Sequence, residues 1–175
     1  GAGCIANDLW DKDFDRQVNR TKTRPLSAGI VKISTAFGLL IIMMIFSLLT
    51  VLLLPALSRI LCLQLSIISL PLIILYPSAK RWFKYPQAIL SLCWGFSVLI
   101  PWAASQSNIN LNVPMVSCWI ATMVWTFGFD TVYAMTDKND DESLGLNSSA
   151  LSLQGKVITP VSISYALTSL FLALG

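Results

Sequence analysis

Histidine is missing from this sequence, and charged residues are scarce. Of its 175 residues none is histidine and only 12% are charged, whereas an ordinary soluble domain has about 25%. Without histidine, nitrogen-rich zinc sites and Ser-His-Asp catalysis lack their usual side chain. The four cysteines show no CxxC spacing, which argues against a disulfide or metal framework. The low charge and a mean hydropathy of +0.68 indicate a membrane protein.

Long stretches of the chain contain no charged residue at all. They cover residues 33–58, 60–79, 85–129 and 157–175, and a membrane-spanning helix needs about 20 apolar residues. The third stretch has room for two helices, because a polar segment divides it at 105–112. Since a backbone in lipid must satisfy its own hydrogen bonds, we expect an all-α, polytopic membrane protein. Its five predicted spans lie near residues 33–54, 60–76, 85–104, 113–134 and 157–175.

All nine acidic residues fall into two short segments, residues 8–15 and 130–142. Four predicted spans separate these segments, and an even number of crossings returns the chain to the side it left. By this count eleven of the twelve Lys and Arg lie on that same side, with only Arg59 opposite. The positive-inside rule makes it the cytoplasmic side. This topology accounts for the net charge of +3, so we expect a lipid bilayer and no nucleic acid as partner.

Both acidic segments carry side chains at helical spacing. At 100° per residue the first places Asp8, Asp11 and Asp15 in one narrow sector, with Asn7 beside it. Asp13 points away from this sector. The second segment has three on one face, and a continued helix would add two more: Asp130, Tyr133 and Asp137, then Asp140 and Asp141. Aligned carboxylates repel by about 0.2–0.5 kcal/mol for each exposed i,i+4 pair, so we expect a cation nearby. Oxygen-only ligands favour Mg²⁺ bound together with phosphate.

The alternative for each acidic segment is a solvated helix end with capping aspartates. Two segments with the same spacing, each at the end of an apolar span, favour a functional site instead. Basic residues follow the first segment at 20–24, and others follow the second span at 80–81. Lys and Arg are natural partners of diphosphate oxygens, although these residues could also serve only to set the topology.

Three motifs resemble those of the UbiA prenyltransferase superfamily. The first acidic segment and the basic residues after it are similar to NDxxDxxxD followed by RTxxRP: Asn7-Asp8-Leu-Trp-Asp11-Lys-Asp-Phe-Asp15, then Arg20-Thr-Lys-Thr-Arg24-Pro. The other two are similar to YxxxK and DxxYxxxD: Tyr76-xxx-Lys80 and Asp130-Thr-Val-Tyr133-Ala-Met-Thr-Asp137. The motifs occur in the family's order across nearly the whole chain. Within the superfamily, residues 130–134 and 145–151 are most similar to 4-hydroxybenzoate polyprenyltransferases.

The resemblance implies a bundle of nine transmembrane helices around a central cavity. Residues 1–175 would form a single UbiA-type domain that is incomplete at both ends. The segment 1–15 would be the end of the second helix, and the first, eighth and ninth helices would be absent. We therefore expect the isolated chain to be inactive, and the protein to reside in a bacterial inner membrane with its aspartate motifs on the cytoplasmic face.

The resemblance also implies an activity, the Mg²⁺-dependent transfer of a polyprenyl group from polyprenyl diphosphate to an aromatic acid such as 4-hydroxybenzoate. The product would enter ubiquinone- or plastoquinone-type quinone biosynthesis. The implied Mg²⁺ ligands are Asn7, Asp8, Asp11, Asp15, Asp130 and Asp137. The implied diphosphate contacts are Tyr76, Lys80, Arg20 and Arg24, with Tyr133, Asp140 and Asp141 as possible additions. Asp130 would also be catalytic, by polarising the phenol.

Three alternatives to this function stay open. The chain could belong to another branch of the superfamily, which makes haem O, chlorophyll, menaquinone or homogentisate-derived quinones. A membrane cation transporter would line a pathway with acidic residues, but the carboxylates here stop at helix ends and the other spans carry none. A non-catalytic scaffold is disfavoured because every motif carboxylate is present.

Overall fold

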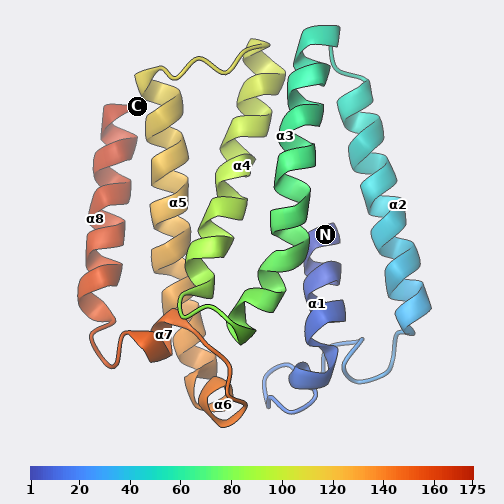
Figure 1. The fold of residues 1–175 in the computed structure, drawn as a ribbon, viewed down its shortest axis with the longest axis vertical. Helices are drawn as coiled ribbons and strands as arrows, with labels where there is room; N and C mark the ends of the chain where they lie inside the picture. Colours follow the sequence, from blue (N-terminus) through green and yellow to red (C-terminus); the bar gives the residue numbers. More distant parts are fainter. The chain divides into compact units, whose positions relative to one another are not determined.

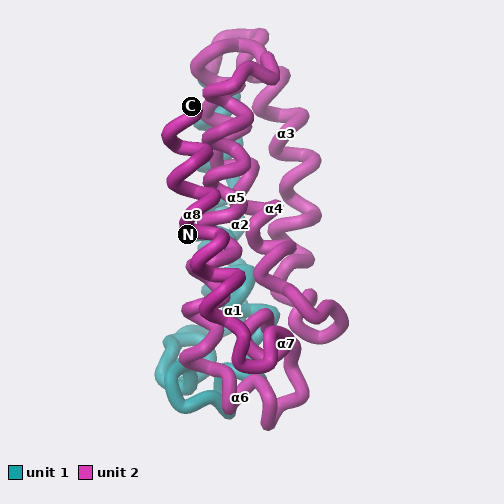
Figure 2. The backbone as a smooth tube through the Cα atoms, turned by 90° about the vertical axis from the view of Figure 1, so that its left-hand side faces the viewer, with its two compact units in different colours: residues 1–53 teal, residues 54–175 magenta.

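The computed structural model describes residues 1–175 as helices joined by connections, of which residues 16–32 form the longest (Figure 1). The chain forms two compact units, residues 1–53 and 54–175 (Figure 2). The elements in chain order are α1 (Ala2–Asp15), α2 (Ile33–Leu52), α3 (Ala56–Leu75), the 3₁₀ helix η1 (Tyr76–Arg81), α4 (Pro86–Gln106), α5 (Val113–Ala134), the 3₁₀ helix η2 (Met135–Asp137), α6 (Lys138–Ser143), α7 (Ser149–Ser152) and α8 (Ile158–Leu174).

The first unit contains α1, α2 and the connection between them. The two helices pack against each other, and α2 is 20 residues long without a charged side chain. Arg16 Nε donates to the Ser27 carbonyl at 3.0 Å, and the Val31 N–H donates to the Pro25 carbonyl at 3.0 Å. These hydrogen bonds fold residues 16–32 back toward the end of α1.

The second unit is built on four long helices packed in the order α3, α4, α5, α8 (Figure 1). The short elements η1, α6 and α7 lie at one end of this unit, where α3 and α5 end and where α4 and α8 begin. At the other end, Ser58 and Ser107 share a hydrogen bond of 2.7 Å between their hydroxyls. Polar connections therefore lie at both ends of the second unit, and the short elements η1, α6 and α7 are all at one of them.

Glycines allow the helices of the second unit to approach closely. A Cβ atom at Gly95 would lie 2.6 Å from Trp119 Nε1, where α4 meets α5. A Cβ atom at Gly128 would lie 2.9 Å from Ser164 Cβ, where α5 meets α8. Small residues at helix contacts are typical of membrane bundles, since association in lipid depends on close packing.

Four helices are long and apolar enough to cross a membrane: Ile33–Leu52, Ala56–Arg81, Pro86–Gln106 and Val113–Ser143. The fifth predicted span is α8, an apolar helix of 17 residues, which is near the lower limit of spanning length. Their outer faces expose large hydrophobic side chains, as lipid contact requires. The chain is an integral membrane protein with an all-α fold.

The predicted spans agree with the observed helices to within two residues at most of their ends. The second span was predicted to start near residue 60, whereas α3 begins at Ala56, directly after Pro55. Arg59 lies within the first turn of this helix, where a long basic side chain can reach the interface while its backbone stays helical. The charge of Arg59 therefore does not mark the start of α3.

Candidate functional site

The first aspartate motif occupies one face of α1. Asp11 and Asp15 are buried, with 4% and 6% of their surface exposed. Asp8 is partly buried and lies on the same face, whereas the Asp13 side chain is 85% exposed. This arrangement is the one predicted from helical phase, and it concentrates negative charge on a single stripe.

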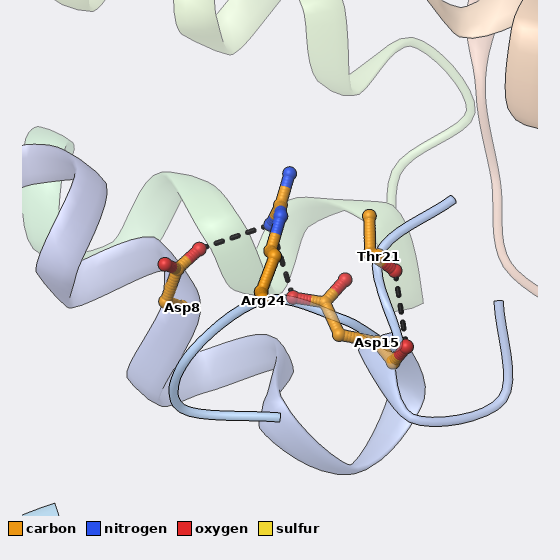
Figure 3. Close-up of polar contacts among 4 residues, drawn as sticks. All are labelled: Asp8, Asp15, Thr21 and Arg24. Carbon is orange, nitrogen blue, oxygen red and sulfur yellow. Dashed lines mark hydrogen bonds and ion pairs between the residues drawn. The ribbon is translucent and has the colours of Figure 1, made fainter. Parts of the chain in front are cut away.

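Arg24 connects two carboxylates of this stripe (Figure 3). Its Nη1 donates to Asp8 Oδ1 at 2.9 Å and to Asp15 Oδ2 at 3.0 Å. The Thr21 hydroxyl donates to the Asp15 carbonyl at 3.1 Å. This bond holds the connection between α1 and α2 against the end of α1. Partial burial raises the pKa of the Asp8 carboxyl, and the nearby Arg24 charge opposes this shift without cancelling it. One guanidinium thus partly neutralises two carboxylates.

The donor set of α1 fits a hard cation. Two of its carboxylates already converge on a single positively charged group, the Arg24 guanidinium, and the available donors are oxygens. No three Asp, Glu, Cys or His side chains come together closely enough to hold a metal by themselves. A hard cation here would therefore take further ligands from water or a phosphate, which is how Mg²⁺ usually binds.

The second aspartate motif does not form one uninterrupted α-helix. α5 ends at Ala134, residues 135–137 form the 3₁₀ helix η2, and α6 follows. A 3₁₀ helix has 3.0 residues per turn, so the 100° phase that relates Asp130 to Tyr133 does not extend to Asp140 and Asp141. Asp130 and Asp137 are partly buried, and Tyr133 is exposed. That Asp140 and Asp141 contribute to a site remains a prediction.

The segment that contains Tyr76 and Lys80 lies at the same end of the second unit as this motif. Both residues belong to η1, which follows α3 directly. The Asn147 backbone N–H donates to the Lys80 carbonyl at 2.7 Å, and its side-chain Nδ2 donates to the same oxygen at 3.2 Å. The structure therefore joins the YxxxK segment to the chain that follows the DxxYxxxD motif.

Buried polar groups extend this connection. The Ser149 N–H donates to Gln87 Oε1 at 2.9 Å, and the Ser149 hydroxyl shares a 2.7 Å hydrogen bond with the Thr131 hydroxyl. Thr131 and Ser149 are fully buried and Gln87 is nearly so. Because Thr131 follows Asp130, this network begins within the second motif.

The predicted site residues divide between the two units. The first unit holds Asn7, Asp8, Asp11, Asp15, Arg20 and Arg24, and the second holds Tyr76, Lys80, Asp130, Tyr133, Asp137, Asp140 and Asp141. Sequence reasoning assigned no role to Asn147, which lies in the stretch 145–151 noted for its resemblance, and did not single out Gln87. One available signal was the position of Gln87, an amide at the start of a long uncharged stretch.

A profile of the UbiA prenyltransferase family matches residues 1–175. The chain belongs to the UbiA prenyltransferase family. A UbiA homologue from Aeropyrum pernix K1, solved in its apo state, superimposes with a TM-score of 0.82 at 28% identity, covering 97% of this chain and 63% of that one. A structure titled for digeranylgeranylglyceryl phosphate synthase superimposes with a TM-score of 0.61 at 20% identity over 97% of this chain and 58% of that one, and shows the shared fold.

Curated members of the UbiA family resemble this chain more closely in sequence. A 4-hydroxybenzoate solanesyltransferase from Synechocystis is 44% identical over 168 residues, which cover 96% of this chain and 56% of that protein. A 4-hydroxybenzoate octaprenyltransferase from Legionella pneumophila is 44% identical over 150 residues, covering 86% and 51%. One from Francisella tularensis is 38% identical over 170 residues, covering 97% and 58%. The chain spans little more than half the length of these relatives.

Proposed function

We propose that the protein containing this chain transfers a polyprenyl group from polyprenyl diphosphate to 4-hydroxybenzoate in quinone biosynthesis. The observation that supports this most is the 44% identity to a 4-hydroxybenzoate solanesyltransferase over 96% of the chain. Every motif carboxylate is present in that stretch. We further propose that residues 1–175 belong to one UbiA-type domain in a bacterial inner membrane. Its aspartate motifs would lie on the cytoplasmic face.

UbiA prenyltransferases generally depend on a divalent metal, and we propose Mg²⁺ for this protein. Its ligands would come from both motifs: Asn7, Asp8, Asp11, Asp15, Asp130 and Asp137. The oxygen donors on α1, two of which converge on a cationic group, support this choice. When bound, the metal would supply positive charge that stabilises the departing diphosphate.

Cationic and phenolic side chains complete the proposed diphosphate site. Arg24 already lies against two of the proposed ligand carboxylates, so it is within reach of a diphosphate bound beside them. Tyr76 and Lys80 are held at the same end of the second unit as Asp130 and Asp137. The remaining proposed contacts are Arg20, Tyr133, Asp140 and Asp141.

In the proposed reaction, the allylic C–O bond of the prenyl diphosphate breaks and the diphosphate leaves with the electron pair. The ring carbon ortho to the phenol of the acceptor forms the new C–C bond. That carbon then loses its proton, for which the released diphosphate is an acceptor, and the ring becomes aromatic again. Asp130 would accept a hydrogen bond from the phenol and so raise the electron density of the ring, and the apolar spans would exclude water from the allylic cation.

The test uses the full-length protein in membranes with polyprenyl diphosphate, 4-hydroxybenzoate and Mg²⁺. We expect a prenylated product whose formation stops when Mg²⁺ is chelated. Asp11→Ala and Asp137→Ala should each lower the rate by about 100-fold or more, as the loss of a charge-stabilising group does. The exposed Asp13 serves as control, and Asp13→Ala should stay near the wild-type rate. Full activity of both ligand variants would contradict the proposal.

The aromatic acceptor is tested separately in the same assay. Homogentisate, a naphthoic acid and haem replace 4-hydroxybenzoate one at a time, with the polyprenyl diphosphate unchanged. We expect turnover with 4-hydroxybenzoate to exceed the others. A preference for one of the other acceptors would overturn the assignment to this branch while leaving prenyl transfer intact.

A further inference from the structure

We propose that Asn147, together with Gln87, is a positioning residue that sets where Tyr76 and Lys80 stand relative to the second aspartate motif. The inference rests on the proposed function for the role of Tyr76 and Lys80 in diphosphate binding. The structural connection itself depends only on hydrogen bonds within the second unit.

Asn147 donates two hydrogen bonds to a single acceptor. Its backbone N–H and its side-chain Nδ2 both donate to the Lys80 carbonyl, at 2.7 and 3.2 Å. The two residues are 67 positions apart in the chain, so neither contact follows from local helix or turn geometry. Together they fix the backbone of Lys80 to the segment that leads from α6 to α7.

A local turn brings Asn147 to this position. Gly145 has a φ of +66°, and its N–H donates to the Glu142 carbonyl at 3.2 Å. The Leu146 N–H donates to the Asp141 carbonyl at 2.9 Å. This pair of bonds is the Schellman motif, in which glycine readily adopts the left-handed conformation that ends a helix. The end of α6 therefore directs Asn147 toward Lys80.

Two further contacts fix the same pair of segments. The Ser149 N–H donates to Gln87 Oε1, and the Ser152 hydroxyl donates to the Lys84 carbonyl at 2.7 Å. The Ser149 hydroxyl pairs with Thr131 at the start of the second motif. Residues 80, 84 and 87 are thus each bonded to the stretch 147–152. We therefore expect the two segments to keep their relative positions.

This arrangement predicts an effect on one substrate only. None of Asn147, Gln87 and Thr131 is proposed to touch a substrate, so their loss should displace Tyr76 and Lys80 without removing any ligand group. Binding of the prenyl diphosphate should weaken, while binding of the aromatic acceptor should not. A purely structural role would instead lower the stability of the protein and affect both substrates alike.

The first experiment measures kinetics and amide hydrogen exchange on the full-length protein in detergent or nanodiscs. Asn147→Ala should raise KM for the polyprenyl diphosphate by about five- to tenfold, the effect of one lost hydrogen bond, with little change in KM for the acceptor. It should also speed exchange in residues 76–85 but not in residues 113–128. Asn139→Ala is the matched control, since Asn139 is an exposed amide on α6, and it should resemble the wild type.

A second pair of variants distinguishes the loss of one hydrogen bond from misfolding. Thr131→Val keeps the shape of the side chain but removes the hydroxyl that pairs with Ser149, whereas Thr131→Ser keeps the hydroxyl. The valine variant should reproduce the KM increase for the diphosphate, and the serine variant should restore a value near wild type. Equal effects of the two variants would contradict positioning through this hydrogen bond.

The outcomes separate this inference from the proposed function. Unchanged exchange of residues 76–85 in Asn147→Ala overturns the inference whether or not the protein is a prenyltransferase. Faster exchange with an unchanged KM for the diphosphate in an active enzyme also overturns it. If the wild type transfers no prenyl group, the proposed function fails and the substrate part of the inference fails with it.

Discussion

The aspartates of α1 are held by a charged side chain, whereas the chain around the second motif is held by neutral hydrogen bonds. In the first unit Arg24 donates to both Asp8 and Asp15. In the second unit amides and hydroxyls join residues 80–87 to residues 147–152. The same chain thus uses two kinds of interaction to hold the two halves of its proposed site.

The difference matters because a ligand can compete with one kind of contact and not with the other. Mg²⁺ and a diphosphate carry the charges that would rearrange an Arg–carboxylate cluster. They have little effect on a buried bond between an amide and a carbonyl. We therefore expect the first unit to respond to ligands by exchanging charge partners, while the second unit provides a fixed frame.

The largest expected effect follows from removing a carboxylate of the charged cluster. Asp15→Asn leaves the side chain nearly the same size but removes a charge that is buried beside Arg24. We expect the prenyl transfer rate of the full-length protein to fall by about 100-fold. Asp13→Asn makes the same chemical change on the exposed side of α1 and should change the rate less than twofold. Equal losses in the two variants would mean that general charge, not the buried stripe, matters.

A smaller effect should follow from removing the cation that joins the carboxylates. Without ligands, Arg24→Gln should lower the free energy of unfolding by about 1–2 kcal/mol, since its two partly exposed ion pairs are charge-assisted hydrogen bonds. Added Mg²⁺ should stabilise this variant more than it stabilises the wild type, because the freed carboxylates can accept the metal. Thermal unfolding with and without Mg²⁺ measures both effects.

Lys22→Gln is the control for Arg24→Gln. It removes the same charge, but the Lys22 ammonium donates to the exposed Asn19 side chain. The unfolding temperature of this variant should therefore match that of the wild type. If Mg²⁺ stabilises Arg24→Gln no more than the wild type, Arg24 does not share these carboxylates with the metal.

The smallest expected effect concerns the turn that brings Asn147 to Lys80 in the second unit. Gly145→Ala places a side chain at a φ of +66° and should lower the free energy of unfolding by about 1 kcal/mol. Gly38→Ala is the opposite case, because Gly38 lies within α2 with nothing near its Cβ position. That change should stabilise the helix by up to about 1 kcal/mol. The two shifts in unfolding temperature should therefore have opposite signs.

Much of the fold could be predicted because membrane helices leave a local signature. An uncharged stretch of sufficient length must be a helix in lipid, so most observed ends lie close to the predicted ones. The buried face of α1 also follows from local spacing, since Asp11 and Asp15 are one helical turn apart. In both cases the signal lies within about 20 neighbouring residues.

The contacts that arrange the site could not be predicted in the same way. Arg24 was expected to contact diphosphate, but its bonds to Asp8 and Asp15 depend on how residues 16–32 fold back. Asn147 meets Lys80 across 67 residues, and no periodic pattern marks an amide for such a role. The change from α to 3₁₀ geometry at Met135 likewise has no proline or glycine to signal it.

The proposed reaction depends most on the two aspartate motifs facing the same side of the membrane. Single cysteines at positions 13, 139 and 108 of the full-length, otherwise cysteine-free protein can be labelled with a membrane-impermeant thiol reagent in right-side-out and inverted vesicles. We predict that positions 13 and 139 react only in inverted vesicles, where the cytoplasmic face is outside, and that position 108 reacts only in right-side-out vesicles. Labelling of positions 13 and 139 from opposite sides would contradict the account.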